Sequence, residues 1–446
     1  MTPAPAAAHR RGIAANRGQF ALQTLQVFFV GLMIGMERAV LPTVARDFGV
    51  APGAFLFLAS FVLSFGLVKG SLNLVAGGLA DRFGRKPVLV AGWLAAIPIP
   101  LLIAAAPNWW WIVAANVFLG VSQGFTWTMT VTSQIDLAGS RQRGLAVGLN
   151  EATGYAAVGL AGLGAALLAH FVGARPALLG FGLTTIAAAL LALFGVRDTL
   201  PWVRAEHAEG GAPAGPRDAP GLWAIFLRMS FRDRAGRAIC QGGVVNKIAD
   251  TMVWVMFPLF FKARGAGLVE IGGLTGAYAM VWGLSQLWTG YLADRVGRKR
   301  PIVAGFFLLA AGTAASALGR SAGVWLPSAA VMGLGMALLY PNLIAAMADR
   351  APPLIRGKAL GTYRYWRDTG YAIGALLLGG IAEISGAALP AIGLTAALVA
   401  GSGLWIAVAL DEITPDPEPP GEAASRPPAS SPPIPPLPRA IVPGRI

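Results

Sequence analysis

Nine ionisable side chains lie within stretches of the chain that are otherwise apolar. These five cations and four acids are Glu37, Arg38, Lys69, Glu151, Lys247, Asp250, Arg364, Arg367 and Asp368. A charge at the centre of a bilayer costs about 2.5–3.5 kcal/mol on insertion scales, so such side chains are expected to face an internal cavity or to pair. Burial raises the pKa of a carboxyl group and a nearby cation lowers it. A carboxyl group under both influences can bind and release a proton near neutral pH. A spare guanidinium can bind a carboxylate or phosphate through two parallel hydrogen bonds.

Two sets of these charges have the spacing of one helix face. Side chains three or four residues apart are neighbours on a helix. Lys247 and Asp250 fit this spacing. Arg364, Arg367 and Asp368 fit it as well. We therefore expect Lys247 to hold Asp250 in its ionised form.

Glu37 is the acid that we expect to carry a proton. Its neighbour Arg38 projects about 100° away around the helix, so the two side chains cannot point the same way. Glu37 also precedes Asp250 by 213 residues, an offset that recurs elsewhere in the chain. Because Lys247 should keep Asp250 ionised, Glu37 is the better proton carrier. The alternative is a structural ion pair between Glu37 and a cation of another helix.

Other polar side chains have a less specific pattern. Gln123 and Trp127 recur at helical spacing and are predicted to line the cavity, with ordinary helix packing as the alternative. Glu151, in LNEATGY, lies early in its segment, so a gate or capping role and a cavity role both remain open. Lys69 is expected to extend toward the membrane interface. The residues expected to form salt bridges at a gate are Asp136, Arg143, Glu151, Asp349 and Arg356.

The composition is that of a membrane protein. Apolar residues make up 55% and charged residues 13% of the 446 residues, against about 45–50% and about 25% in globular domains. A spanning helix needs about 20 residues, so twelve need about 240. The single cysteine, Cys240, excludes an internal disulfide and a metal cluster built on cysteines. Only three histidines and no nucleotide-binding loop occur, so we expect neither an enzyme nor a cofactor or metal.

The net charge of +14 does not indicate nucleic-acid binding, because the bases are unevenly placed. Twenty-five of the 35 lie in segments predicted to be cytoplasmic, and five lie within the apolar segments. The five in outer loops are Arg46, Arg175, Lys262, Arg264 and Arg320. Positive charge on the cytoplasmic side predicts an inner-membrane protein with both termini in the cytoplasm. Residues 1–18 lack the apolar core of a cleavable signal peptide.

The apolar segments predict an all-α fold with twelve transmembrane helices. Their approximate ranges are 19–45, 53–76, 87–106, 109–136, 144–170, 176–195, 238–263, 269–292, 301–319, 323–348, 357–383 and 386–410. The predicted parts are a disordered cytoplasmic tail (1–18), a six-helix bundle (19–196), a cytoplasmic linker (197–237), a second six-helix bundle (238–410) and a disordered Pro-rich tail (411–446). Within the linker, GLWAIFLRMSFRDR (221–234) could be an amphipathic helix in the interface or a plain linker helix.

An internal repeat relates the two bundles. The stretch GGLADRFGRKP, starting at Gly77 in a predicted loop, returns as GYLADRVGRKRP starting at Gly290. The same offset of 213 residues relates Glu37 to Asp250, Gly120 to Gly333, Asp136 to Asp349, and Arg143-Gly144 to Arg356-Gly357. After that the register slips by three, and Gly154-Tyr155 matches Gly370-Tyr371. A repeat held over this many positions indicates a chain built from two like halves.

The repeated motif resembles the signature of the major facilitator superfamily, where it lies in cytoplasmic loops between helices 2 and 3 and between helices 8 and 9. The resemblance covers about residues 19–410 and implies a solute site between the halves at mid-membrane. It also implies that Asp81 faces the positive N-terminal end of helix 11 and that Asp294 faces helix 5, which closes the cytoplasmic side. The gating residues that it implies are Gly77, Asp81, Arg82, Gly84, Arg85, Lys86, Gly290, Asp294, Arg295, Gly297, Arg298 and Lys299.

The resemblance implies a secondary transporter that works by alternating access, moves a small solute and is coupled to protons. Its drug exporters usually carry R-x-x-Q-G in helix 4, whereas this chain has GVSQG with Gly120 at the arginine position. The excess of one cation among the buried charges favours a small anionic or polar solute over a lipophilic cation. Drug efflux by proton antiport and a membrane sensor or assembly partner without transport are the alternatives. The expected partners are the solute, protons and lipid, with no nucleic acid, and the expected state is a monomer.

Overall fold

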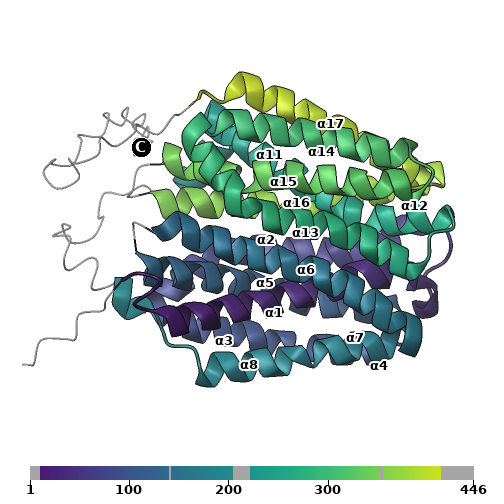
Figure 1. Cartoon of the computed structure of the whole chain (residues 1–446), viewed down its shortest axis with the longest axis horizontal. Coiled ribbons are helices and arrows are strands. Elements are labelled where there is room, and N and C mark those ends of the chain that lie inside the picture. Colours follow the sequence, from purple (N-terminus) through teal and green to yellow (C-terminus); the bar gives the residue numbers. More distant parts are fainter. Residues whose placement is uncertain (1–10, 140–141, 204–220, 352–354, 413–446) are drawn as a thin grey trace, which may run out of the picture. The chain divides into compact units, whose positions relative to one another are not determined.

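The computed structural model describes residues 11–139, 142–203, 221–351 and 355–412, and within them it leaves out the side chains of Arg143, Phe181 and Asp294. In these ranges the ordered elements are all helical (Figure 1). The predicted tails therefore lie outside the described residues up to residue 10 and from residue 413, as does the linker over 204–220. Residues 11–16 form a turn in which the Ile13 amide donates to Gln142 Oε1 at 2.8 Å.

The first half contains six spanning segments, two of which are broken once. Its elements are α1 (Arg17–Val40), η1 (Leu41–Thr43), η2 (Ala45–Phe48), α2 (Phe55–Phe83), α3 (Arg85–Ala96), α4 (Pro98–Ala105), α5 (Trp109–Ala138), α6 (Arg143–Val172), α7 (Ala174–Gly182) and α8 (Thr184–Phe194). The start of α5 is set by Asn108, whose side chain accepts a hydrogen bond from the Trp110 amide and caps the helix.

The second half repeats this plan after a short helix that precedes its first span. Its elements are α10 (Leu222–Leu227), η4 (Arg228–Arg232), α11 (Arg234–Thr251), η5 (Met252–Met256), α12 (Phe257–Ala263), α13 (Leu268–Val296), α14 (Lys299–Leu318), α15 (Ala322–Arg350), α16 (Arg356–Ser385) and α17 (Leu389–Ala409). The side chain of Asp233 accepts a hydrogen bond from the Gly236 amide and caps α11.

Twelve long helical segments result, six in each half, as the sequence predicts. Nine of them are long and apolar enough to cross a membrane, counted over the described ranges. The other three are α5, α13 and α16, with 30, 29 and 30 residues. Helices α5 and α16 carry polar side chains that face the interior of the bundle, among them Gln123 and Asp368.

The prediction of a loop that begins at Gly77, after the second span, is wrong. Gly77 to Phe83 continue α2, and Gly84 alone breaks the helix before α3 begins at Arg85. Gly84 has φ of 99° and Gly297, its counterpart in the second copy, has φ of 86°. Side chains other than glycine rarely adopt these angles, so the motif glycines allow the chain to turn between two helices without a loop.

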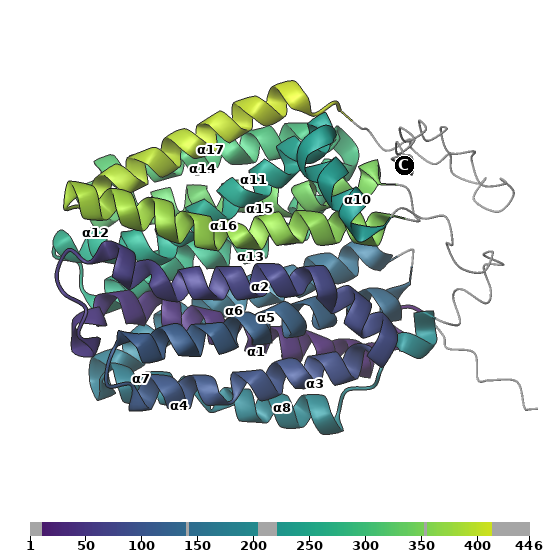
Figure 2. The same ribbon diagram turned by 180° about the vertical axis from the view of Figure 1, so that it is seen from behind.

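The two halves pack against each other through α2 beside α16 and α6 beside α13. Figure 1 shows α1 to α8 in its lower part and α11 to α17 in its upper part, and Figure 2 shows the same division from behind. We call the end of the bundle with Gly84 and Gly297 the motif end, and the end with η1 and α12 the opposite end.

Close contact between the halves is concentrated away from the motif end. A Cβ at Gly66 of α2 would lie 2.6 Å from the Ala372 amide nitrogen, and one at Gly379 would lie 3.0 Å from Leu56 Cα. A Cβ at Gly77 or Gly361, nearer the motif end of the same helices, would meet no atom within 4 Å. The halves are thus packed at the opposite end and apart at the motif end.

Substitution of Gly66 by alanine should lower the thermal unfolding midpoint of the purified protein. The added methyl group would overlap the backbone of α16, and overpacking costs about 1–3 kcal/mol. Gly78→Ala is the matched control, because a Cβ there meets no atom within 4 Å and alanine favours helix by up to about 1 kcal/mol. An unchanged midpoint for Gly66→Ala would contradict the close contact of α2 with α16.

Candidate functional site

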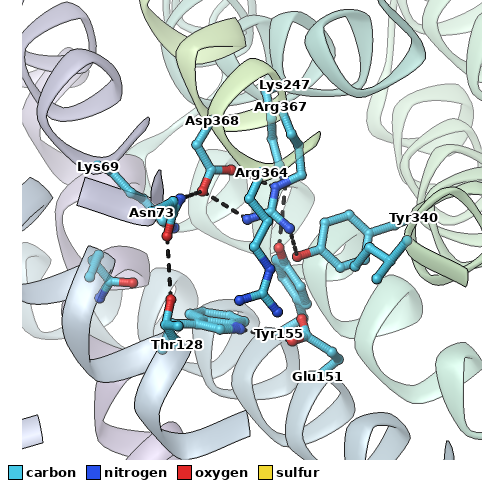
Figure 3. Close-up of a pocket in the computed structure, with 13 residues that line it drawn as sticks. Lys69, Asn73, Thr128, Glu151, Tyr155, Lys247, Tyr340, Arg364, Arg367 and Asp368 are labelled. Atoms are coloured by element: carbon cyan, nitrogen blue, oxygen red, sulfur yellow. Dashed lines mark hydrogen bonds and ion pairs between the residues drawn. The ribbon is translucent and has the colours of Figure 1, made fainter. Parts of the chain in front are cut away.

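A cavity lies between the two halves (Figure 3). On α2 its lining residues Lys69 and Asn73 follow the tight contact at Gly66, so the cavity lies on the motif-end side of that contact. Helices α2, α5 and α6 contribute from the first half, and α11, α15 and α16 from the second. Its lining residues are Lys69, Asn73, Gln123, Trp127, Thr128, Glu151, Tyr155, Lys247, Tyr340, Ile344, Arg364, Arg367 and Asp368. Eight of the thirteen carry a charge or an aromatic hydroxyl group, which is unusual for the interior of a membrane protein.

One ion pair in the cavity is fixed by two parallel hydrogen bonds. Arg367 Nε and Nη2 donate to the two carboxylate oxygens of Asp368 at 2.6 and 2.8 Å, and Arg367 Nη1 donates to the Tyr340 hydroxyl at 3.0 Å. Asn73 of α2 also donates to Asp368, and the Thr128 hydroxyl donates to Asn73 at 3.3 Å. The network joins α16 to α2 and α5 and compensates both charges.

A second ion pair lies deeper. Lys247 Nζ is 2.6 Å from Asp250 Oδ2. The hydroxyls of Tyr278 and Tyr371 donate to Asp250 at 2.6 and 3.1 Å, so both carboxylate oxygens are bonded. Lys247 Nζ also lies 3.4 Å from the Tyr155 hydroxyl of the first half. The spacing of Lys247 and Asp250 therefore places them together, with tyrosines that complete the shell.

Two further cations in the cavity have no carboxylate partner among the described residues. Lys69 is buried, and its Nζ lies 5.3 Å from the ring centroid of Phe65 and 5.4 Å from that of Trp127. The Arg364 side chain extends into the cavity, and its buried Nε has no hydrogen-bond partner (Figure 3). The expectation that Lys69 reaches the membrane interface is wrong, since its side chain lines the cavity.

Glu151 lines the same cavity. Trp127 Nε1 donates to Glu151 Oε1 at 2.9 Å, whereas Oε2 is buried and has no partner in the described structure. Gln123 is also in the lining, and its amide donates to the Val30 carbonyl at 3.0 Å. Six of the nine charges predicted to face a cavity or to pair line this cavity, namely Lys69, Glu151, Lys247, Arg364, Arg367 and Asp368. Asp250 lies outside the lining but pairs with Lys247.

Glu37 and Arg38 lie apart from this lining, nearer the opposite end. Glu37 is fully buried, and its Oε2 accepts a hydrogen bond from Asn116 of α5 at 2.9 Å while Oε1 has no described partner. No ion pair of Glu37 with a cation is present among the described residues. The predicted separation of the two side chains agrees with these different surroundings.

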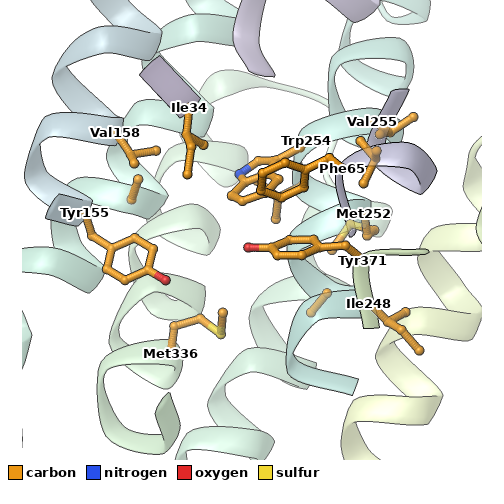
Figure 4. Packing of buried hydrophobic residues seen from close by; sticks show 14 of the residues in the cluster. Ile34, Phe65, Tyr155, Val158, Ile248, Met252, Trp254, Val255, Met336 and Tyr371 are labelled. Carbon is orange, nitrogen blue, oxygen red and sulfur yellow. The ribbon is translucent and has the colours of Figure 1, made fainter. Parts of the chain in front are cut away.

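Arg38 is enclosed by aromatic rings from both halves. Its guanidinium carbon lies 5.0, 4.7 and 5.0 Å from the ring centroids of Phe61, Phe65 and Trp254. Trp254 stacks on Tyr371 at 5.1 Å, and Figure 4 shows both rings beside Phe65. Cation–π attraction of this kind is worth about 2 kcal/mol or more when it is desolvated. The aromatic layer separates the cavity from the opposite end.

Polar contacts hold the opposite end closed. Lys262 Nζ at the end of α12 donates to the Thr43 carbonyl of η1. The amide of Leu56, at the start of α2, donates to the Glu383 carboxylate of α16 at 2.9 Å. Both contacts cross between the two halves at this end.

The motif residues form ion pairs within their own half. Arg85 Nη1 lies 2.9 Å from Asp81 and Arg85 Nε lies 3.0 Å from Asp136, and in the second copy Arg298 Nε lies 3.2 Å from Asp349. The Asp81 side chain is 72% exposed, and no contact with a described residue of α16 is recorded. The contact with helix 11 that the resemblance implies is absent here and stays a prediction for the state in which the motif end is closed.

The remaining predicted gate residues are more exposed. Arg82 and Arg295 lie over the neighbouring rings of Phe83 and Tyr291, at 5.1 and 4.4 Å. Arg356 donates to the Ala348 carbonyl at 3.1 Å. Lys86 and Lys299 belong to the first turns of α3 and α14, and the side chains of Arg143 and Asp294 lie outside the described structure.

Two acids beyond the motif complete its structure, and sequence reasoning missed them. Asp198 Oδ1 accepts from the Arg85 amide at 3.1 Å, and Glu412 Oε1 accepts from the Lys299 amide at 3.0 Å. Both cap the helix that follows the motif glycine, where a negative charge is favourable. A Cβ at Gly84 would lie 1.8 Å from Asp198 Oδ2, so the glycine is needed for close approach as well as for its φ. The sequence signal that could have indicated these caps is an acid that follows the last apolar segment of each half within a few residues.

The tyrosines and asparagines of the site were also missed. The repeat already matched Tyr155 with Tyr371, and both reach the Lys247–Asp250 pair. Asn116 lies one helical turn before Gly120, where drug exporters carry arginine. A Cβ at Gly120 would lie 2.9 Å from the Phe65 carbonyl oxygen of α2, so an arginine would not fit without separating α5 from α2.

Twelve spans in two like halves around a charged cavity define an integral, multi-pass membrane transporter. The family model described as Major Facilitator Superfamily matches residues 24–238 and again residues 239–443. The chain belongs to the Major Facilitator Superfamily, whose members are transporters and not enzymes. This confirms the resemblance and the twelve-helix fold inferred from the sequence.

Three relatives and one solved structure illustrate the similarity. An uncharacterised MFS-type transporter of Salmonella typhimurium is 28% identical over 369 residues, which are 77% of this chain and 84% of the relative. The galactose-proton symporter of Escherichia coli is 24% identical and covers 75% of each chain. The niacin transporter of Acinetobacter baylyi is 30% identical over 35% of each chain. The crystal structure of the human organic anion transporter MFSD10 has the same fold, with a TM-score of 0.64 and 18% identity over 88% of this chain and 99% of that one.

Removal of the Lys247 charge should destabilise the protein more than removal of the whole ion pair. Lys247→Met leaves Asp250 buried without a cation, and breaking a buried pair in this way costs about 3–5 kcal/mol. Lys247→Met/Asp250→Asn removes both charges and should recover much of the thermal unfolding midpoint. A double variant that unfolds no later than the single variant would show that the two charges do not compensate each other.

Proposed function

We propose that this transporter moves a small organic anion by alternating access and couples the movement to protons. The observation that carries the proposal is the presence of two unpaired cations, Lys69 and Arg364, in the cavity between the halves. Lys247 and Arg367 have acids within 2.6 Å, so their charges are already compensated. Glu151 is the one acid of the described lining without a cation at ion-pair distance. The cavity is therefore short of negative charge, which a bound anion would supply.

The form of the unpaired cations favours a carboxylate or a phosphate. A guanidinium presents a planar fork of donors that matches such a group with two hydrogen bonds, whereas an ammonium acts as a point charge. Trp127, Tyr155 and Tyr340 line the same cavity and add aromatic surface to its wall. This combination of an anion receptor with aromatic walls suits a small organic acid better than a free inorganic ion.

Two relatives support secondary transport of a small solute. One is named a niacin transporter and the other a galactose-proton symporter. We infer that the present conformation is open at the motif end, where positive charge is concentrated in the sequence and which we assign to the cytoplasm. The Asp81 contact with helix 11 would form when that end closes and the aromatic layer around Arg38 opens. Both termini would then lie in the cytoplasm, in an inner-membrane monomer.

We assign proton carriage to Glu37. Asp250 and Asp368 are each held by a cation and by further donors, so their charge is compensated in this conformation. Glu37 has one amide partner and no cation within ion-pair distance among the described residues. A buried acid without a cation is the group whose proton can leave when its surroundings open to water. Opening of the aromatic layer near Arg38 would provide that change of surroundings.

Substitution of Arg364 should weaken binding of an organic anion. Charge-assisted hydrogen bonds are worth about 1.5–3 kcal/mol, so Arg364→Gln should reduce the affinity for benzoate by about 10- to 100-fold. Arg364→Lys keeps the charge without the fork and should have an intermediate affinity. Isothermal titration of the purified protein measures these values, with Arg320→Gln, at the opposite end, as the charge-matched control. Equal affinity of the wild type and Arg364→Gln for benzoate would show that Arg364 does not bind the anion.

Substitution of Glu37 by glutamine should separate transport from the proton gradient. Proteoliposomes of Glu37→Gln should still exchange substrate across the membrane but should no longer accumulate it in response to a pH gradient. Glu151→Gln is the comparison, since Glu151 is the other acid without a cation partner in the described structure. Loss of the pH response in Glu151→Gln, together with its retention in Glu37→Gln, would show that Glu151 and not Glu37 carries the proton.

A further inference from the structure

The short segment before the second half has a face that the bundle leaves uncovered. In α10 and η4, the residues Trp223, Leu227 and Phe231 are 69%, 48% and 55% exposed. They recur every four residues and so follow one side of the helix. Ile225 and Met229 on the other side are buried against the bundle. The exposed side is apolar and aromatic although it lies beside the motif end of α16 (Figure 2).

Positive charge borders this apolar face. Arg228 and Arg232 directly follow Leu227 and Phe231, and neither makes an ion pair with a carboxylate of the described residues. The nearby acid, Asp233, is engaged as the cap of α11. Arg234 follows and donates to the Val408 carbonyl at 2.8 Å. The segment thus presents aromatic and basic side chains together, and within the described residues Asp233 makes no ion pair with Arg228 or Arg232.

The same segment is joined to the helix that carries the cavity arginines. Phe226 stacks on Trp366 of α16, with ring centroids 6.0 Å apart and an interplanar angle of 19°. Trp366 Nε1 donates to the Ser230 hydroxyl at 2.8 Å, and Phe231 contacts the edge of the same ring. Trp366 precedes Arg367 in the chain. A ligand on the exposed face would therefore act on the part of α16 that lines the cavity.

We propose that the exposed face of α10 and η4 binds anionic phospholipid of the leaflet at the motif end, and that bound lipid holds the start of α16. Aromatic and leucine side chains enter the boundary between headgroups and acyl chains, and an arginine near an anionic surface is attracted to it. Tryptophan and phenylalanine are suited to this depth because their rings prefer the interface. The lipid is the source of the anion, because the apolar stripe requires acyl chains beside the phosphate.

A lipid fits this surface better than a soluble anion does. Arg228 is half-buried and Arg232 is exposed to solvent, so a free phosphate would be bound weakly. The apolar side chains between them would remain in water if a soluble anion were the ligand. Exposed aromatic stripes rimmed by charge mark membrane contact sites. The proposal does not depend on the substrate in the cavity.

Lipid binding can be measured on the purified full-length protein in detergent. Addition of phosphatidylglycerol should raise the thermal unfolding midpoint more than addition of phosphatidylcholine does. Arg228→Gln/Arg232→Gln should lose most of this difference, and Arg228→Lys/Arg232→Lys should keep it. Arg46→Gln/Arg320→Gln removes two exposed arginines from the opposite end and should also keep it, which excludes a general effect of net charge.

Two results would overturn the proposal. One is a full phosphatidylglycerol effect in Arg228→Gln/Arg232→Gln, which would place the lipid elsewhere. The other is equal stabilisation by glycerol phosphate, which would identify a site for a soluble phosphate and not for a lipid. Native mass spectrometry of the same samples counts bound lipid directly, so the test remains decisive if a variant has a lower starting midpoint.

The effect on α16 has its own readout. Phosphatidylglycerol should slow hydrogen–deuterium exchange of the α16 peptide that covers residues 357–366 in the wild type. In Arg228→Gln/Arg232→Gln the same lipid should leave this exchange unchanged. If the lipid slowed hydrogen–deuterium exchange only in other helices, bound lipid would not stabilise α16 through Phe226 and Trp366.

Discussion

Compensation of buried charge is the constraint on which this structure depends. The apolar spans carry nine ionisable side chains, and each must find a partner, a cavity or a surrounding of rings. Asp368 and Asp250 are paired with cations, and Arg38 lies among three aromatic rings. Lys69 and Arg364 remain without an acid in the described structure, and both line the cavity. These two unpaired cations thus lie in the cavity between the halves.

Glycine contacts determine where the two halves can meet. Helix α2 approaches α16 closely at Gly66 and Gly70, and α6 approaches α13 at Gly159. These contacts close the opposite end while the motif end stays apart. At the motif end each half is stabilised within itself, by the pairing of Arg85 with Asp136 and by the cap that Asp198 provides to α3. Each half is therefore stabilised within itself, as the alternating access proposed above requires.

The fold could be predicted because the length of each apolar segment and the constant offset of the repeat can both be read along the sequence without knowledge of any contact in space. Spacing also paired Lys247 with Asp250 and placed Arg364, Arg367 and Asp368 on one helix face, since these residues belong to one helix; it did not indicate that Asp368 pairs with Arg367 and not with Arg364. Contacts between helices could not be predicted in this way. Asn116 reaches Glu37 and Asn73 reaches Asp368 across the bundle, and nothing local to either asparagine indicates its partner. Lys69 was misplaced for the same reason, because its position along the helix does not reveal which face the cavity takes.

The proposed function requires that the cavity binds negative charge. Titration of the wild-type protein with a panel of small carboxylates, each paired with its neutral amide, measures this directly. We expect that at least one carboxylate binds and that its amide binds at least about tenfold more weakly, since the amide lacks the charge-assisted hydrogen bonds. Equal binding of acid and amide, or binding of a lipophilic cation such as tetraphenylphosphonium in place of every carboxylate, would contradict it.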